Sequence, residues 1–142
     1  MSPENKALAR RVIEEVWNRQ NLAVTEQLIA PGYIGHDPAT PGTISGIEGF
    51  KAFFRTYTSA FPDQHFTIHD LVAEGDRVVT RWSVEGTHTG ALSGIPATGK
   101  RIRITGVTIS RIENGKIAED HTHWDALGLM QQLGLVQKSA TA

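Results

Sequence analysis

Ionisable side chains crowd the last extended segment of the chain, where a strand is predicted over residues 117–125. With a period of two, one face of this strand collects Ile117, Glu119, His121, His123 and Asp125. Burying so many polar groups in a packed core would be costly. The face therefore either meets solvent or forms a polar patch inside a cavity, and this segment alone leaves both interpretations open.

Asp125 stands where the last strand meets an apolar helical pattern over residues 126–135. An aspartate before such a pattern is typically the N-cap of the helix. A carboxyl group at the end of a strand can also act as a general acid or base at the rim of a pocket. Both roles are compatible, and the sequence favours the cap.

A metal site is the second chemistry that this strand suggests. Two histidines spaced H-x-H, His121 and His123, can bind one ion, with Asp125 or His36 as a third ligand. The chain has no cysteine, and no H-E-x-x-H motif accompanies the pair. We therefore expect a pocket without metal or other cofactor.

Two further histidines are candidates for binding a ligand. His36 follows Tyr33 in a glycine-flanked segment beside a loop, and His88 shares a strand face with Trp82. A satisfied loop histidine and a solvated residue at a strand end are the common alternatives. Several aromatic residues are candidates for lining a pocket, although such residues belong to the core more often: Trp17, Phe53, Tyr57 and Trp82.

The elements that must position these residues follow in a clear order. Helical periodicity predicts helices that begin at Ser2, near Val24 and near Ile47. Alternation predicts long strands over residues 66–72, 78–84, 101–112 and 117–125, with Gly106 as a candidate bulge and Asn114-Gly115 as a hairpin turn. Helices followed by antiparallel strands and a closing helix predict an α+β fold, with helices on one face of a curved antiparallel sheet.

The whole-chain properties exclude several classes of function. A length of 142 residues predicts a single domain over residues 1–142. The formal net charge of -1 argues against nucleic acid or an anionic membrane as a partner. The absence of cysteine excludes disulfides, and the N-terminus lacks the apolar stretch of a signal peptide. We expect a cytoplasmic protein whose partner is a small molecule.

The order of elements and a set of short strings resemble the SnoaL-like polyketide cyclase family, also called ester cyclases, of the nuclear-transport-factor-2-like superfamily. The strings are Phe61-Pro62-Asp63, Gly75-Asp76-Arg77-Val78-Val79, Gly86-Thr87-His88-Thr89-Gly90, Thr98-Gly99-Lys100, Asn114-Gly115-Lys116-Ile117, Trp124-Asp125-x-Leu127-Gly128 and Gln132-Leu133-Gly134. The resemblance implies a cone-shaped sheet with the N-terminal helices packed on its concave face, and a homodimer.

The resemblance also implies an intramolecular aldol condensation on a hydrophobic carbonyl compound, without metal. The family's general acid/base near the end of the last strand matches Asp125, and we expect His123, or else His36, to bind the enolate oxygen. His121 stands where many relatives have a large apolar residue, so we expect a more polar pocket. The alternative is a binding module of the same fold that holds a small ligand without catalysis.

Overall fold

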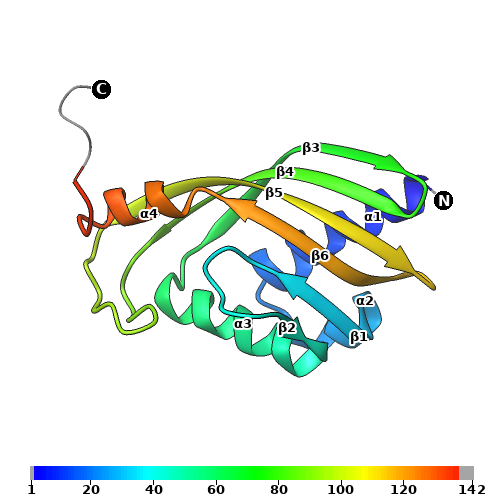
Figure 1. The fold of residues 1–142 in the computed structure, drawn as a ribbon, viewed down its shortest axis with the longest axis horizontal. Coiled ribbons are helices and arrows are strands. Elements are labelled where there is room, and N and C mark those ends of the chain that lie inside the picture. The colour runs from blue at the N-terminus through cyan, green and yellow to red at the C-terminus, as the bar shows by residue number, and fades with distance from the viewer. Residues whose placement is uncertain (1, 138–142) are drawn as a thin grey trace.

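The computed structural model describes residues 2–137 (Figure 1). Residues 1 and 138–142, which the predicted domain includes, lie outside the described part. The helices are α1 (Ser2–Arg11), the π-helix η1 (Val12–Asn18), the 3-10 helix η2 (Leu22–Val24), α2 (Thr25–Leu28), α3 (Gly46–Ala60) and α4 (Ala126–Gln132). The strands are β1 (Ile29–His36), β2 (Ile44–Ser45), β3 (His65–Glu74), β4 (Arg77–Thr87), β5 (Arg101–Glu113) and β6 (Lys116–Trp124).

The strands form one curved sheet in the order β2-β1-β6-β5-β4-β3. The α+β class and the curvature are confirmed, but the prediction of an antiparallel sheet is wrong at one position, because β1 runs parallel to β6. The long chain between these two strands, which includes α3 and four other strands of the sheet, supplies the crossover that a parallel pair needs. The sheet is therefore mixed.

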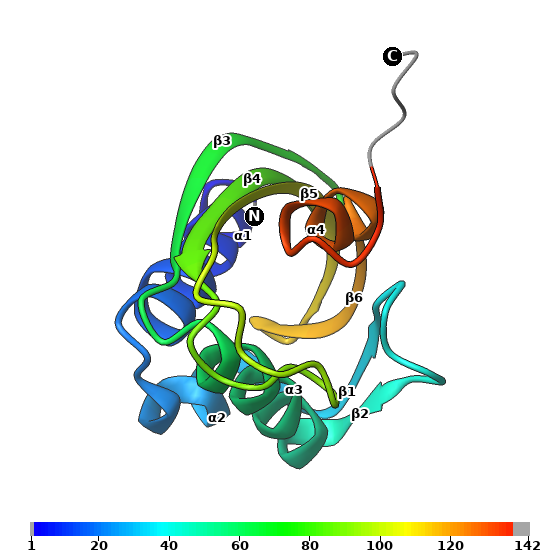
Figure 2. The same cartoon turned by 90° about the vertical axis from the view of Figure 1, so that its left-hand side faces the viewer.

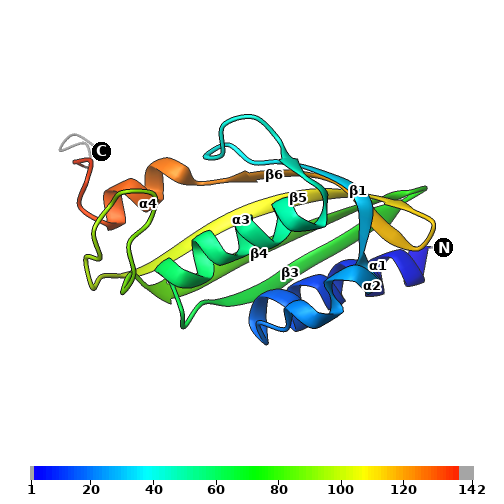
Figure 3. The same ribbon diagram turned by 90° about the horizontal axis from the view of Figure 1, so that it is seen from below.

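Helices cover the concave face of the sheet, as the resemblance implied (Figure 2). Helix α1 packs against β3 and β4, while α3 packs against β1 and β2 (Figure 3). The main core lies between these layers and includes Val16, Ile29, Phe50, Val78 and Ile117. Among residues 2–137, no helix is both long and apolar enough to cross a membrane.

Helix α4 closes one end of the curved sheet. Its Leu129, together with the following Leu133, packs with Phe61, Ile102 and Ile104 in a second buried cluster. The amide groups at the start of α4 are capped by the side chain of the preceding Asp125. This end of the molecule is therefore held by apolar packing and by one helix cap.

A bulge at Ala118 decides which side chains of β6 face the helices. Ile117 pairs with Ile112 of β5, whereas Glu119 pairs with Arg111, so Ala118 is an extra residue on β6. Such an insertion reverses the alternation of all later side chains in the strand. Beyond Ala118 the even-numbered residues face inward, and the assumption of one continuous period is wrong.

The predicted bulge at Gly106 is also wrong, since β5 pairs without interruption there with both neighbours. The glycine has a different role. A Cβ atom at this position would lie 2.4 Å from Cζ2 of Trp82, so only glycine allows the indole to lie across the strand. Gly106 thus makes room for an aromatic side chain on the concave face.

Candidate active site

A cavity of about 150 Å³ lies between the concave face of the sheet and the helices. Its wall is mostly apolar and aromatic, and polar side chains from the middle strands face it at intervals. The aromatic residues in the wall are Trp17, Tyr33, Phe50, Phe53, Tyr57, Phe61, Phe66, Trp82 and Trp124. An apolar cavity with a few polar groups is the usual form of a small-molecule site.

Asp120 is the acidic residue that β6 turns into this cavity. The Tyr33 hydroxyl donates to its Oδ2 at 2.9 Å, and the Ser110 hydroxyl donates to its Oδ1 at 2.6 Å. Burial raises the pKa of the Asp120 carboxyl above its usual range, and this effect outweighs the two hydrogen bonds, which lower it. The cavity therefore holds a carboxyl group that is more basic than an exposed aspartate.

Tyr33 remains a hydrogen-bond donor to Asp120. Its ring is buried and packs edge-on against Phe50. Burial first, and then the nearby charge of Asp120, raise the pKa of the Tyr33 hydroxyl well above its ordinary value. The phenol thus stays protonated at neutral pH and holds the carboxyl group in one orientation.

Two more polar groups face the cavity without a hydrogen-bond partner among the described residues. The side-chain amide nitrogen of Gln64 is buried and unpaired. The Tyr57 hydroxyl is not engaged in any hydrogen bond within residues 2–137, and burial, with a smaller contribution from Asp37, raises its pKa to about 12. An unpaired buried donor is costly, so a ligand oxygen is a natural partner for the Gln64 amide, and the half-buried Tyr57 can donate to a ligand as well.

A second carboxyl group, that of Asp37, lines the cavity next to β1. Its Oδ1 accepts a hydrogen bond of 2.7 Å from the indole nitrogen of Trp124, and its Oδ2 accepts from Ala39 and Thr40 in the following loop. Asp37 therefore links the loop after β1 to the end of β6, and its oxygens are already engaged. Asp120, whose pKa burial raises, is the better candidate for acid/base chemistry.

Asp125 is exposed and does not line the cavity. Its Oδ1 accepts a hydrogen bond of 2.9 Å from the Gly128 amide, which is the N-cap geometry that the sequence favoured. The prediction that Asp125, His123 and His36 converge in one cavity is wrong. The bulge at Ala118 turned the strand, so the geometric basis for a general base at position 125 is lost.

The other predicted side chains of β6 also face away from the cavity. His121 and His123 are exposed, and neither lines the wall. His36 does border the cavity, but its ring stacks on that of His121, with centroids 4.2 Å apart. Both rings contact Glu119 on the outer face of the sheet. His123 is exposed on the same face, so it is not placed to bind an enolate oxygen in the cavity.

His88 is fully buried but lies outside the cavity wall. Its Nδ1 accepts a hydrogen bond of 3.2 Å from the Thr98 amide, and its backbone pairs with Lys100 and Gly99. The ring packs on Phe61 at a centroid distance of 5.3 Å. His88 therefore fastens the loop between β4 and β5, and the prediction that it faces a ligand is wrong.

Of the predicted binding residues, a majority do line the cavity: Trp17, Tyr33, His36, Phe53, Tyr57 and Trp82. The sequence analysis missed the polar groups Asp37, Gln64, Ser110 and Asp120. The hairpin at Asn114-Gly115 gave no signal for Asp120, because it pairs the buried Ile112 with the buried Ile117, and alternation from Ile117 would turn Glu119 inward instead. No residue type marks the bulge at Ala118, so the position of Asp120 could not be derived.

Fold and cavity together define the class: a curved α+β cone that encloses an apolar cavity with one basic carboxyl group. The sequence model described as "SnoaL-like polyketide cyclase" matches residues 7–133. The chain belongs to this family.

Individual relatives agree with that assignment. The chain is 32% identical over 133 residues to the aklanonic acid methyl ester cyclase DnrD of Streptomyces peucetius, covering 89% of this chain and 88% of the relative. TsrD from Streptomyces laurentii is 32% identical with a TM-score of 0.84, over 96% of this chain and 98% of the other. A protein from Jannaschia sp. CCS1 has a TM-score of 0.88 at 23% identity, over 95% and 94% of the two chains, a likeness that concerns the fold.

Proposed function

We propose that the chain is a cyclase that closes a ring in a polyketide-type carbonyl compound by metal-free acid/base chemistry, with Asp120 as the base. The observation that carries the proposal is the Asp120 carboxyl group, which faces an apolar cavity, has a raised pKa and is held by Tyr33 and Ser110. The named activity of DnrD, an aklanonic acid methyl ester cyclase, supports an ester of this type as substrate.

The reaction begins with a proton transfer to Asp120. Each carboxylate oxygen accepts one hydrogen bond from Tyr33 or Ser110 and retains a free lone pair. The carboxylate takes a proton from the carbon next to a substrate carbonyl and leaves an enolate. Desolvation strengthens the base, and a positioned base of this kind contributes about a hundredfold or more to the rate.

The enolate oxygen needs a donor, and we assign it to Gln64 or Tyr57. Both groups face the cavity and lack a hydrogen-bond partner among residues 2–137. The enolate carbon then attacks a second carbonyl group of the same molecule, a carbon–carbon bond forms, and the new alkoxide takes the proton back from Asp120. The cavity wall assists by holding the flexible chain in a folded, reactive conformer.

The test is a matched pair of variants, Asp120→Asn and Asp125→Asn, assayed with aklanonic acid methyl ester and with shorter β-keto esters by chromatography of the cyclised product. We expect Asp120→Asn to lower kcat by about a hundredfold or more. Asp125→Asn should leave kcat unchanged, because asparagine caps a helix as well as aspartate does.

A loss of turnover in Asp125→Asn but not in Asp120→Asn would contradict the proposal. Binding of the esters with no turnover in the unmodified protein would favour the alternative, a binding module in which the aromatic wall provides the affinity. The predicted homodimer and the cytoplasmic location stay predictions, which the oligomeric state in solution and the cellular distribution would test.

A further inference from the structure

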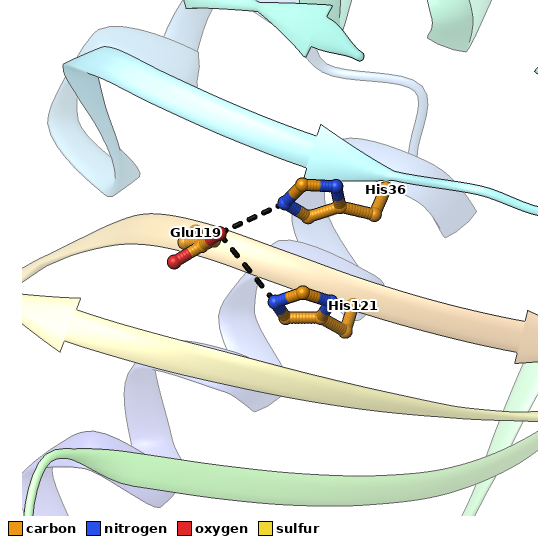
Figure 4. A group of neighbouring side chains, drawn as sticks. All are labelled: His36, Glu119 and His121. Carbon is orange, nitrogen blue, oxygen red and sulfur yellow. Dashed lines mark hydrogen bonds and ion pairs between the residues drawn. The ribbon is translucent and has the colours of Figure 1, made fainter. Parts of the chain in front are cut away.

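We propose that His36, Glu119 and His121 form a binding site for a divalent transition-metal ion, with zinc as the expected ion, on the outer face of the sheet. The three side chains come from the parallel strands β1 and β6 and meet outside the cavity (Figure 4). The site is separate from the proposed reaction at Asp120, and neither proposal depends on the other.

The ligand atoms are already close to the positions that a metal requires. His36 Nε2 lies 2.8 Å and His121 Nε2 lies 3.4 Å from the same oxygen of Glu119. All three ligand atoms lie within 4.8 Å of one another. Ligands at 2.0–2.1 Å from a tetrahedral zinc ion are about 3.4 Å apart, so the distance from His121 to Glu119 already matches, whereas His36 and Glu119 need to separate slightly.

The choice of ligands also points to a transition metal. Two imidazole nitrogens and one carboxylate oxygen form a set that zinc and its neighbours prefer, whereas calcium and magnesium prefer oxygen alone. Both Nε2 atoms approach the same Glu119 oxygen, and the His36 and His121 rings, which are stacked 9° from parallel, would tilt apart to direct both lone pairs at one ion. The remaining coordination positions face solvent, because His121 is exposed and His36 is half-buried.

Glu119 is held in place from its other side. Arg111 donates to its second oxygen at 3.4 Å and also pairs with Glu113 at 2.9 Å. One oxygen of Glu119 therefore contacts the guanidinium group and the other contacts the two imidazoles. A partner such as Arg111 on the far side of a ligand orients that ligand toward the metal. The positive charge of Arg111 is shared between two carboxylates, which limits its repulsion of a bound ion.

A bound ion would join two segments that are 83 residues apart in sequence. The pairing of β1 with β6 is irregular between Ile29 and Ile34, so the ladder between these two strands is interrupted there. His36 also precedes Asp37, which lines the cavity. Metal binding would therefore stabilise the β1 edge and the loop that follows it.

The experiment titrates chelator-treated protein with zinc chloride, using isothermal titration calorimetry, and follows thermal unfolding in parallel. We expect one zinc ion per chain and an increase in Tm of about 5 °C or more when zinc exceeds its Kd about a hundredfold. Cobalt chloride, added instead, should give the visible absorption bands of a nitrogen-and-oxygen site with few ligands.

The variants His121→Ala and Glu119→Gln should each weaken zinc binding by about tenfold or more and reduce the Tm increase by about half or more at the same zinc concentration. His123→Ala is the matched control, because this histidine lies on the same outer face of β6 and belongs to no ligand group within the described residues. Circular dichroism without metal checks that each variant is folded. Absence of zinc binding, one ion shared by two chains, or an equal loss in His123→Ala would overturn the proposal, and a metal-free ion pair between Glu119 and the histidines would remain.

Discussion

The two faces of β6 have similar polar compositions but opposite environments. Beyond Ala118, Asp120, Thr122 and Trp124 line the cavity, whereas Glu119 and His121 lie on the outer face. Burial raises the pKa of Asp120, while on the outer face the hydrogen bond from His36 lowers the pKa of Glu119. Two neighbouring carboxyl groups thus acquire different chemistry from their surroundings alone.

One inserted residue decides which carboxyl group of β6 faces the cavity. Ala118 is the extra residue, and its Cβ carries no functional group. If Ala118 instead paired regularly with β5, the strand would turn Glu119 and His121 toward the helices.

The pH dependence of turnover should identify the carboxyl group that reacts. Since the pKa of Asp120 is raised, kcat/KM should increase with pH along a limb that lies above the ordinary aspartate value of 3.8. The limb should disappear in Asp120→Asn and persist in Asp125→Asn. The persistence of the limb in Asp120→Asn would assign the reaction to another group.

The raised pKa of Asp120 should also make the stability of the fold depend on pH. A carboxyl group whose pKa is higher in the folded than in the unfolded state destabilises the fold as it ionises. The free energy of unfolding should therefore decrease as pH increases from 3.8 through the raised pKa. Asp120→Asn should remove this decrease, so its advantage over the unmodified protein should grow with pH, as denaturation at several pH values would show.

Gly106→Ala should disturb the inner face of the neighbouring strand β5. The new Cβ would lie 2.4 Å from Cζ2 of Trp82, so the indole must leave its position in the cavity wall. We expect a loss of about 1–3 kcal/mol in the free energy of unfolding and weaker ligand binding. Gly32→Ala is the control, since its Cβ would meet no atom within 4 Å. Equal effects of the two substitutions would argue against close packing at Trp82.

His123→Ala should have the smallest effect, because this outer-face side chain is exposed. We expect a change of less than about 0.5 kcal/mol in the free energy of unfolding and kcat within about twofold of the unmodified protein. A large decrease in kcat would instead support the prediction from the sequence that His123 binds the enolate oxygen. Calorimetry and the cyclisation assay on one preparation would measure both.

Local patterns predicted the elements of this protein well. The helix that starts at Ser2, the helix near Ile47 and the hairpin at Asn114-Gly115 all occur, because they depend on side-chain periodicity and on turn residues with positive φ. The parallel pairing of β1 with β6 was missed, since it joins segments that no local pattern connects. Tertiary packing alone selects such a pair.

The sequence predicted the aromatic wall of the cavity but not the carboxyl group that faces it. Trp17, Tyr33 and Trp82 were found by type, because large aromatic residues are buried wherever the fold allows. Asp120 was passed over, because alternation assigned it to the face opposite Asp125, and a bulge has no characteristic residue.

The amino-acid pattern was enough to indicate the family, the main helices, the four long strands and the polar residues available on β6. Which of these polar residues face the cavity depends on how β6 pairs with β5 around Ala118, and this pairing is set by the folded chain. The physical reason is that side-chain orientation in a strand is a property of register, and a shift of one residue exchanges the two faces completely.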